Sequence, residues 1–219
     1  MKIDLVTIPG WQSPYGPGGK LVPLPIRMRK IHPSAFQALR SLGARLVFTD
    51  VYRDPVASLE VRAQKRGVQL PGYSAHGFGL AVDLDIKRTL ELRKINKTGL
   101  DELMLRHRWR CFRADHAENK SEAWHYTWSA AGPGAHAVDD AIQGLYGGCF
   151  VLSPKQIQIA LASLRLYGGA IDGQIGPLSR RGLFLFQCAW ELEPTGAAGP
   201  DTQRLLAVVT ADTTPQPIG

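Results

Sequence analysis

One short pattern occurs twice in the last third of the chain and restricts how that part can fold. Residues 173–179 and 196–202 both read Gly-x-x-Gly-Pro-x-Ser/Thr, and a stretch with apolar residues at helical spacing follows each copy. Glycine adopts turn conformations that other residues avoid. Proline fits the first turn of a helix, where its missing N–H would have no partner anyway. The pattern therefore predicts two tight turns, each leading into a helix.

A further helix is predicted ahead of these two, because Ser153 suits an N-cap and Pro154 suits the first helical position. The apolar residues expected in the core are Ile157, Leu161, Leu164 and Leu166 of this helix, Leu183, Phe184, Phe186 and Trp190 of the next (178–190), and Leu205 and Leu206 of the last (202–209). We expect an all-α three-helix domain over residues 152–210 and a flexible tail over residues 211–219.

Residues 1–135 alternate between helical and strand patterns. The first thirty residues are rich in Gly and Pro and are expected to form an extended lead-in. Helices are predicted at 33–43, 55–66 and 90–106, the last broken at Thr98-Gly99, and strands at 45–52, 79–86, 110–113 and 123–128. Helices that flank a small antiparallel sheet make an α+β domain. Residues 136–151 are expected to be a linker.

The formal net charge of +7 comes entirely from residues 1–150, because residues 151–219 are balanced. A basic domain attracts polyanions, which include nucleic acid, anionic membrane surfaces and wall polymers rich in phosphate and carboxylate. No stretch of the sequence is long and apolar enough to cross a membrane. Asp4 and Pro9 interrupt the first ten residues, so no signal peptide is expected. We expect a monomer made in the cytoplasm, without nucleic acid as a partner and without stable membrane insertion.

The three cysteines do not indicate a disulfide framework or a cysteine-ligated zinc site, because their number is odd and no Cys-x-x-Cys pair occurs. Cys111 and Cys188 have apolar neighbours in the sequence and are expected to be buried thiols. A disulfide between Cys149 and Cys188 is left open.

Two segments, residues 74–83 and 122–125, carry the residues that point to chemistry. They supply His76, Asp83 and His125, together with a separate acid, Glu122. Two imidazoles and one carboxylate suit zinc at three corners of a tetrahedron, and water takes the fourth in a catalytic site. A nearby carboxylate can accept a proton from that water. Asp85 is an alternative to Asp83, since both lie on one strand face.

The neighbours of this set have expected roles too, some of them beside a structural alternative. Because residues three apart on a strand face opposite ways, Glu122 should lie on the turn before the strand of His125. Ser74 is a candidate to bind a substrate carbonyl or carboxylate. Arg53 suits a developing oxyanion, or else pairs with Asp50 or Asp54. Gly77 and Gly79 are expected to leave room for the metal and the substrate. Trp124 is expected either to form a substrate platform or, like Trp128, to lie in the core. The other histidines are expected to be surface or structural residues: His32, His107, His116 and His136.

The order Ser-x-His-x-x-Gly-x-Ala-x-Asp, followed by Glu-x-x-His, resembles the zinc D-alanyl-D-alanine peptidases of the M15 type. These include D,D-carboxypeptidases, D,D-dipeptidases and phage L-alanyl-D-glutamate endopeptidases. The matching positions are Ser74, His76, Gly79, Ala81, Asp83, Glu122 and His125, with Tyr52-Arg53 upstream, and they span about residues 35–130. The resemblance implies one zinc ion held by His76, Asp83 and His125. It also implies Glu122 as the general base and Arg53 as a group that binds and polarises the substrate.

The C-terminal segment resembles a second family, the three-helix peptidoglycan-binding module. The resemblance rests on residues 167–177, on Phe186-Gln187 and on the turn at 195–202. It implies wall contacts near Tyr167, Asp172 and Gly173, while a purely structural turn at 171–174 is the alternative. A catalyst tethered to a wall-binding module works at a raised effective concentration on its insoluble substrate.

Together these patterns predict a zinc peptidase that cuts the peptide part of peptidoglycan, as a phage endolysin released through a membrane pore. A bacterial D,D-carboxypeptidase of wall metabolism is one alternative. A non-catalytic wall-binding or virion protein is another. The motif leaves three bonds open as the one cut: L-Ala–D-Glu, D-Ala–diamino acid and D-Ala–D-Ala.

Overall fold

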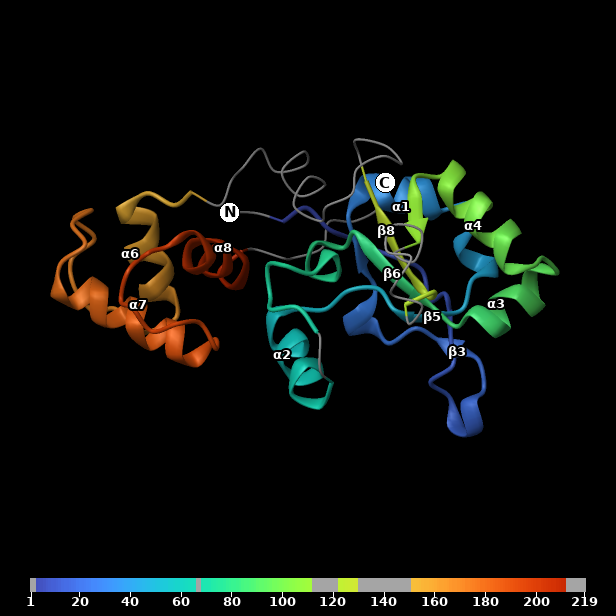
Figure 1. Cartoon of the computed structure of the whole chain (residues 1–219), viewed down its shortest axis with the longest axis horizontal. Coiled ribbons are helices and arrows are strands. Elements are labelled where there is room, and N and C mark those ends of the chain that lie inside the picture. Colours follow the sequence, from blue (N-terminus) through green and yellow to red (C-terminus); the bar gives the residue numbers. More distant parts are fainter. Residues whose placement is uncertain (1–2, 66–67, 112–121, 130–150, 212–219) are drawn as a thin grey trace. The chain divides into compact units, whose positions relative to one another are not determined.

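The computed structural model describes residues 3–65, 68–111, 122–129 and 151–211. Contacts within the chain divide it into two compact units, one built on residues 4–147 and the other on residues 148–212. Figure 1 shows both units. The expected linker and tail lie almost wholly outside the described residues.

The lead-in of the first unit is folded and not merely extended. Two antiparallel strand pairs form: β1 (Val6–Thr7) pairs with β4 (Lys30–Ile31), and β2 (Gln12–Ser13) pairs with β3 (Val22–Pro23). Short 3₁₀ turns, η1 (Pro17–Gly19) and η2 (Ile26–Met28), connect them. The apolar side chains of this segment are buried, among them Leu5, Ile8, Trp11 and Leu24.

Trp11 joins the lead-in to the rest of the unit. Its indole stacks on Phe36 and Phe48 with ring centroids 6.0 and 5.2 Å apart. Gly43 permits this packing, since a Cβ atom there would lie 2.2 Å from the Trp11 ring. Helix α1 (Pro33–Leu39) ends before Gly43, which instead begins the 3₁₀ turn η3 (Gly43–Arg45). The prediction that Gly43 terminates the helix was therefore wrong, and packing against Trp11 is the reason for a glycine there.

A four-stranded antiparallel sheet forms the centre of the first unit, in the order β5-β6-β8-β7. The strands are β5 (Phe48–Asp50), β6 (Ala81–Leu84), β8 (His125–Trp128) and β7 (Trp109–Cys111). Phe48, Val82, Trp109 and Tyr126 are fully buried on this sheet. Strands β5, β6 and β8 are shorter than predicted, but the predicted α+β class with a small antiparallel sheet is confirmed.

Polar side chains set the starts of the helices in this unit. Asp54 caps α2 (Pro55–Gln64), Asp85 caps α3 (Ile86–Arg93), and Asn96 caps α4 (Lys97–Arg106) by accepting a hydrogen bond from the backbone N–H of Gly99. The helical region therefore breaks at 94–96 and not at Thr98-Gly99 as predicted. Lys94 takes a left-handed conformation there, with φ of 55°, and Asn96 suits an N-cap.

The second unit consists of α6 (Pro154–Ser163), α7 (Pro177–Ala189) and α8 (Pro200–Val209) around one apolar core. Ser153 and Gln156 form a reciprocal capping box at the start of α6. The predicted all-helical unit is confirmed, with two corrections. Phe184 and Cys188 are exposed rather than buried, because Leu183, Phe186 and Gln187 occupy the inner face of α7.

Each of the two repeated turns is held by its own buried glutamine. The Gln158 side chain accepts from Gly173 N at 2.7 Å and donates to Gln174 O at 3.1 Å. The Gln187 side chain accepts from Gly196 N at 2.8 Å and donates to Ala197 O at 2.8 Å. Both glutamines are almost completely buried, so these bonds satisfy amide groups that would be costly to leave unpaired. The sequence repeat is therefore a structural repeat, in which a helical glutamine fixes the turn.

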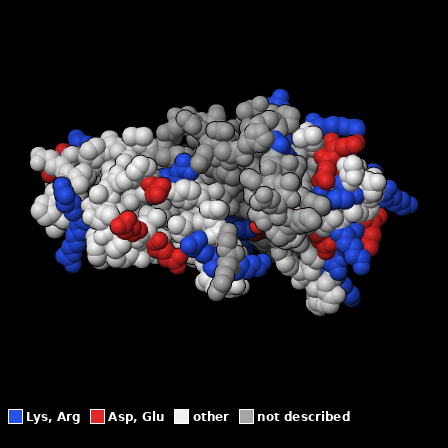
Figure 2. Space-filling model, in the orientation of Figure 1, with Lys and Arg blue, Asp and Glu red and all other residues white. Residues whose placement is uncertain are grey.

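No described helix is both long and apolar enough to span a bilayer. The face drawn in Figure 2 carries Lys and Arg side chains interspersed with Asp and Glu.

Candidate metal centre

Three side chains from different parts of the first unit meet at one point. His76 comes from the 3₁₀ turn η4 (Ala75–Phe78), Asp83 from β6 and His125 from β8. Asp83 and His125 are direct partners in the register of the two strands, which places their side chains together. One nitrogen of each histidine and one carboxylate oxygen lie within 4.8 Å of one another. The side chains singled out in the sequence as zinc ligands therefore do converge.

The Asp83 carboxylate is the centre of the group. Its Oδ1 atom lies 2.7 Å from His125 Nδ1 and 3.3 Å from His76 Nε2. Burial alone would raise the pKa of Asp83, but the two facing imidazoles outweigh burial and hold it below its ordinary value. The carboxylate is therefore ionised at neutral pH, the form in which carboxylates bind metals.

His76 is completely enclosed, and its tautomer follows from its neighbours. Its Nδ1 atom lies 3.0 Å from the carbonyl oxygen of Val51. A carbonyl only accepts hydrogen bonds, so Nδ1 carries the proton. The other nitrogen, Nε2, is buried and has no hydrogen-bond partner among the described residues. Metal-bound histidines characteristically donate from the nitrogen that does not bind the ion, as Nδ1 does here.

The charges around His76 favour a cation at this position. Burial lowers the pKa of the imidazole, whereas the carboxylates of Asp83 and Asp50 raise it, and the net shift is upward. Without an added positive charge, the Nε2 lone pair would face a carboxylate oxygen, and two acceptors repel. A proton or a metal ion relieves this repulsion.

Gly79 fixes the path of the segment that carries His76. Its φ of +64° is left-handed, and a Cβ atom there would lie 2.6 Å from the backbone nitrogen of His32. The His32 N–H donates to the Gly79 carbonyl at 2.9 Å, joining this turn to the end of β4. The glycine thus makes room for the backbone at Ile31–His32, not for metal and substrate as predicted. A Cβ at Gly77 would make only an ordinary contact of 3.7 Å.

Arg53 lies beside the cluster and is held by two acids. Its Nε–H donates to Asp50, and one of its terminal nitrogens lies 3.4 Å from Asp83 Oδ2. The sequence-based alternative of an Arg53–Asp50 ion pair is therefore present, together with a contact to the proposed metal ligand. Asp54, the other acid considered, instead caps α2 with a 2.8 Å hydrogen bond from Ala57 N.

Asp50, named from the sequence only as an alternative partner of Arg53, also belongs to the site. It stands opposite Asp83 in the register of β5 and β6. One of its oxygens binds Arg53, and the other is buried without a hydrogen-bond partner among the described residues. Its position directly before Val51-Tyr-Arg was the available signal, because a strand-end acid three residues before an arginine can orient it.

The positions of the remaining predicted residues follow mainly from hydrogen bonds with the backbone. Glu122 lies on a turn, where its carbonyl accepts from the N–H of His125 at 3.1 Å, as expected. Ser74 is half-buried and precedes η4, and its carbonyl accepts from Gly77 N. Asp85 is not part of the cluster, since its Oδ1 caps α3 through Arg88 N at 3.1 Å. That alternative to Asp83 is excluded.

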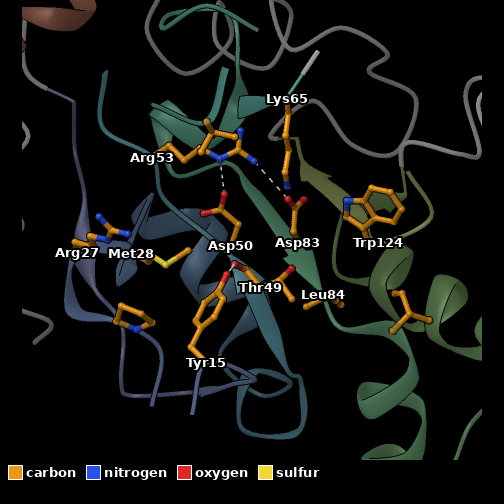
Figure 3. Close-up of a pocket in the computed structure, with 13 residues that line it drawn as sticks. Tyr15, Arg27, Met28, Thr49, Asp50, Arg53, Lys65, Asp83, Leu84 and Trp124 are labelled. Carbon is orange, nitrogen blue, oxygen red and sulfur yellow. Dashed lines mark hydrogen bonds and ion pairs between the residues drawn. The ribbon is translucent and has the colours of Figure 1, made fainter. Parts of the chain in front are cut away.

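A pocket of about 650 Å³ opens beside the cluster. Figure 3 shows Arg53, Asp50 and Asp83 on one side of it and Tyr15 on another. Trp124 lines this pocket with 43% of its surface exposed, whereas Trp128 is buried. The expectation of a core position is therefore correct for Trp128 and wrong for Trp124. The role of Trp124 as a substrate platform stays a prediction.

The candidate wall contacts of the second unit take part in its internal bonding. Asp172 Oδ1 accepts from the side chain of Gln158 and from Gln174 N, both at 2.8 Å. Tyr167 donates to Ala170 O at 2.6 Å, and Gly173 has φ of +82°. These features fit the structural alternative for the turn, although Asp172 is exposed.

Other histidines and cysteines lie apart from the cluster or outside the described residues. His32 is buried, accepts from Ser34 N and stacks on Trp128, a structural role. Cys111 is buried beside Lys97 and Tyr126. His116, His136 and Cys149 lie outside the described residues, so the Cys149–Cys188 alternative does too.

The comparison with protein-family models matches residues 153–206 to the family described as "Putative peptidoglycan binding domain". The match covers α6, α7, the first part of α8 and both repeated turns. It supports the predicted wall-binding module and peptidoglycan as a partner of the chain. A search of curated proteins finds no match.

Proposed function

We propose that the chain is a zinc-dependent peptidase that hydrolyses peptide bonds of bacterial peptidoglycan. The observation that carries the proposal is the buried convergence of His76, Asp83 and His125, with His76 Nε2 3.3 Å from Asp83 Oδ1. The peptidoglycan-binding family match of the second unit supplies the substrate class.

The donor set fits zinc. Tetrahedral ligands at the usual zinc distances are about 3.3–3.5 Å apart. The separation of 3.3 Å between His76 and Asp83 agrees with this, and the 2.7 Å contact of His125 with Asp83 would open slightly. Zinc at these three residues would supply Lewis acidity and a water molecule that loses a proton near neutral pH.

The protein residues would carry out the proton transfers and the orientation of the substrate. Glu122 would accept a proton from the attacking water and return it to the leaving amine nitrogen. Arg53, fixed by Asp50, would hold the carbonyl oxygen of the scissile bond by charge-assisted hydrogen bonding. Val51 O would keep the His76 ring in its orientation.

Release from a host cell as a phage endolysin is the biological setting that we propose for this activity. The excess positive charge of residues 1–150 would attract an anionic wall. The second unit would hold the catalyst on the polymer and raise its local concentration.

Digestion of purified peptidoglycan followed by mass spectrometry tests the proposal. The zinc-loaded protein should release peptides with new termini, which identify the bond cut. Glu122→Gln should keep the fold and bound zinc and reduce turnover by about 10²–10⁴-fold. Asp85→Asn, an acid that caps α3 outside the cluster, is the matched control. Unchanged turnover by Glu122→Gln would contradict the role of Glu122, and no new termini with the native protein would contradict the peptidase function.

A further inference from the structure

The pocket beside the metal cluster is built from parts of the first unit that are distant in the sequence. Its lining residues are Tyr15, Pro25, Arg27, Met28, Thr49, Asp50, Arg53, Val61, Lys65, Asp83, Leu84, Ile86 and Trp124. The lead-in, which matches no family pattern, forms a wall of this pocket. Because Asp83 belongs to both the lining and the cluster, a molecule that fills the pocket lies against one of the three proposed metal ligands.

The three cations in this lining differ in whether they form ion pairs. Arg53 contacts both acids of the lining, Asp50 and Asp83. The other two cations, Arg27 and Lys65, are exposed, and neither forms an ion pair with a described residue in the structure. In Figure 3, Arg27 lies on the Tyr15 side of the pocket, and the Lys65 side chain extends from above toward the side of Asp83. Two cations on different walls of one pocket leave a net positive charge for a ligand to balance.

The pKa of Tyr15 is affected by charged groups on both sides of the pocket. Its hydroxyl donates to the carbonyl of Thr49. Burial raises its pKa, the charges of Asp50 and Asp83 raise it further, and Arg27 and Arg53 lower it. Charges of the lead-in and of the cluster therefore act on one point in the pocket.

We propose that Arg27 and Lys65 each bind a carboxylate of the peptide substrate, and that these carboxylates are not part of the bond cut. The inference rests on the proposed function and deepens it. Acidic residues of a peptide carry ionised carboxylates at neutral pH, and amidation of these groups removes the charge. Guanidinium and ammonium groups bind carboxylates by charge-assisted hydrogen bonds.

The size and the apolar part of the lining fit a short peptide. A volume of about 650 Å³ lies within the range of ligand pockets. Met28, Val61 and Trp124 offer apolar surface for the aliphatic parts of the peptide, while the two cations select the charged part. The site would therefore make the enzyme prefer peptides with free carboxylates over amidated ones.

Two synthetic stem peptides test this, one with free side carboxylates and one with the same groups amidated. The variants are Arg27→Gln and Lys65→Gln. Arg40→Gln and Lys87→Gln are matched controls, because each also removes one exposed positive charge but lies outside the pocket lining. For the free-carboxylate peptide, kcat/KM should fall by about three- to tenfold in each test variant. The values for the amidated peptide, and those of both controls, should stay unchanged.

Binding of the same peptides is measured separately by calorimetry on the full chain carrying Glu122→Gln. The test variants should raise Kd for the free-carboxylate peptide only. Equal losses for both peptides, equal losses in the controls, or no loss would overturn the carboxylate sites. If the native protein cleaves neither peptide, the peptidase function fails, and the calorimetric comparison still decides whether Arg27 and Lys65 bind the carboxylates.

Discussion

The Nε2 atom of His76 lies 3.3 Å from Oδ1 of Asp83, while the opposite nitrogen of the ring faces the carbonyl oxygen of Val51. With the proton on Nδ1, a lone pair points at an ionised carboxylate inside the protein. Two facing acceptors repel inside a protein, so this arrangement favours a proton or a metal ion between the two atoms. The relationship connects the fold of the first unit to its proposed chemistry, because β6 and η4 position the two residues.

Asp50→Asn should lower activity without removing zinc. The amide keeps the shape of Asp50 but loses the charge that holds Arg53. We expect kcat/KM on peptidoglycan to fall by about tenfold, the size of effect of one charge-assisted hydrogen bond, with zinc content unchanged. Asp54→Asn, in which the helix cap survives, should behave like the native protein. Loss of zinc from Asp50→Asn would show instead that Asp50 supports the metal ligands.

Gly79→Ala should destabilise the first unit far more than Gly77→Ala. The left-handed φ of +64° and the approach to His32 N leave no space for a methyl group at Gly79, whereas Gly77 has ordinary contact distances. We expect a loss of about 2 kcal/mol or more in the free energy of unfolding for Gly79→Ala. Urea denaturation of both variants measures it. Equal stability of the two variants would contradict the packing described for this turn.

Gln158→Leu should destabilise the second unit, because it leaves Gly173 N and Gln174 O without their partner inside the protein. An unsatisfied buried group costs about 1–3 kcal/mol. Amide hydrogen exchange at Gly173 should quicken accordingly. Gln174→Ala is the control, since Gln174 is exposed and only its backbone enters these bonds. Native exchange rates in Gln158→Leu would contradict the role of the glutamine.

Tyr126 should make stability fall at alkaline pH. Its hydroxyl is buried, donates to Asp101 at 2.7 Å and accepts from Lys97 at 3.1 Å. Burial, and then Asp101, raise its pKa well above the ordinary value. A raised folded-state pKa stabilises the fold below the unfolded pKa of about 10, and this stability is lost as pH rises further.

The comparison with Tyr126→Phe isolates this effect. Near pH 7 the native protein should be more stable by about 1 kcal/mol, the contribution of a hydrogen bond. As pH rises from about 9 to about 11, through the unfolded pKa of about 10, this difference in the free energy of unfolding should shrink. Urea midpoints at several pH values measure it. A gap that is independent of pH would show that Tyr126 ionises as readily in the folded state as in the unfolded one.

The cluster and the helical unit were within reach of sequence reasoning because their signals are local. His76 and Asp83 lie seven positions apart, and His125 opens a strand of alternating pattern. The repeated Gly-Pro turns marked the starts of α7 and α8. Helix and strand periodicity then limits which faces can meet.

The fold of the lead-in was beyond reach for a physical reason. Strands β1 to β4 are two residues long, too short for any alternation to be read. Their order depends on long-range packing, chiefly of Trp11 on Phe36 and Phe48. The exposure of Phe184 likewise depends on which face of α7 the other helices cover, and helical spacing alone did not separate it from Leu183.

Zinc content is the measurement that tests the central claim most directly. The purified full chain, dialysed against zinc and then against buffer without it, should retain close to one zinc ion per chain by elemental analysis. His76→Ala should lose it, and His32→Ala, in which a buried histidine outside the cluster is replaced, should keep it. Retention of the same zinc content by His76→Ala, or no zinc in the native protein, would contradict a metal centre at His76, Asp83 and His125.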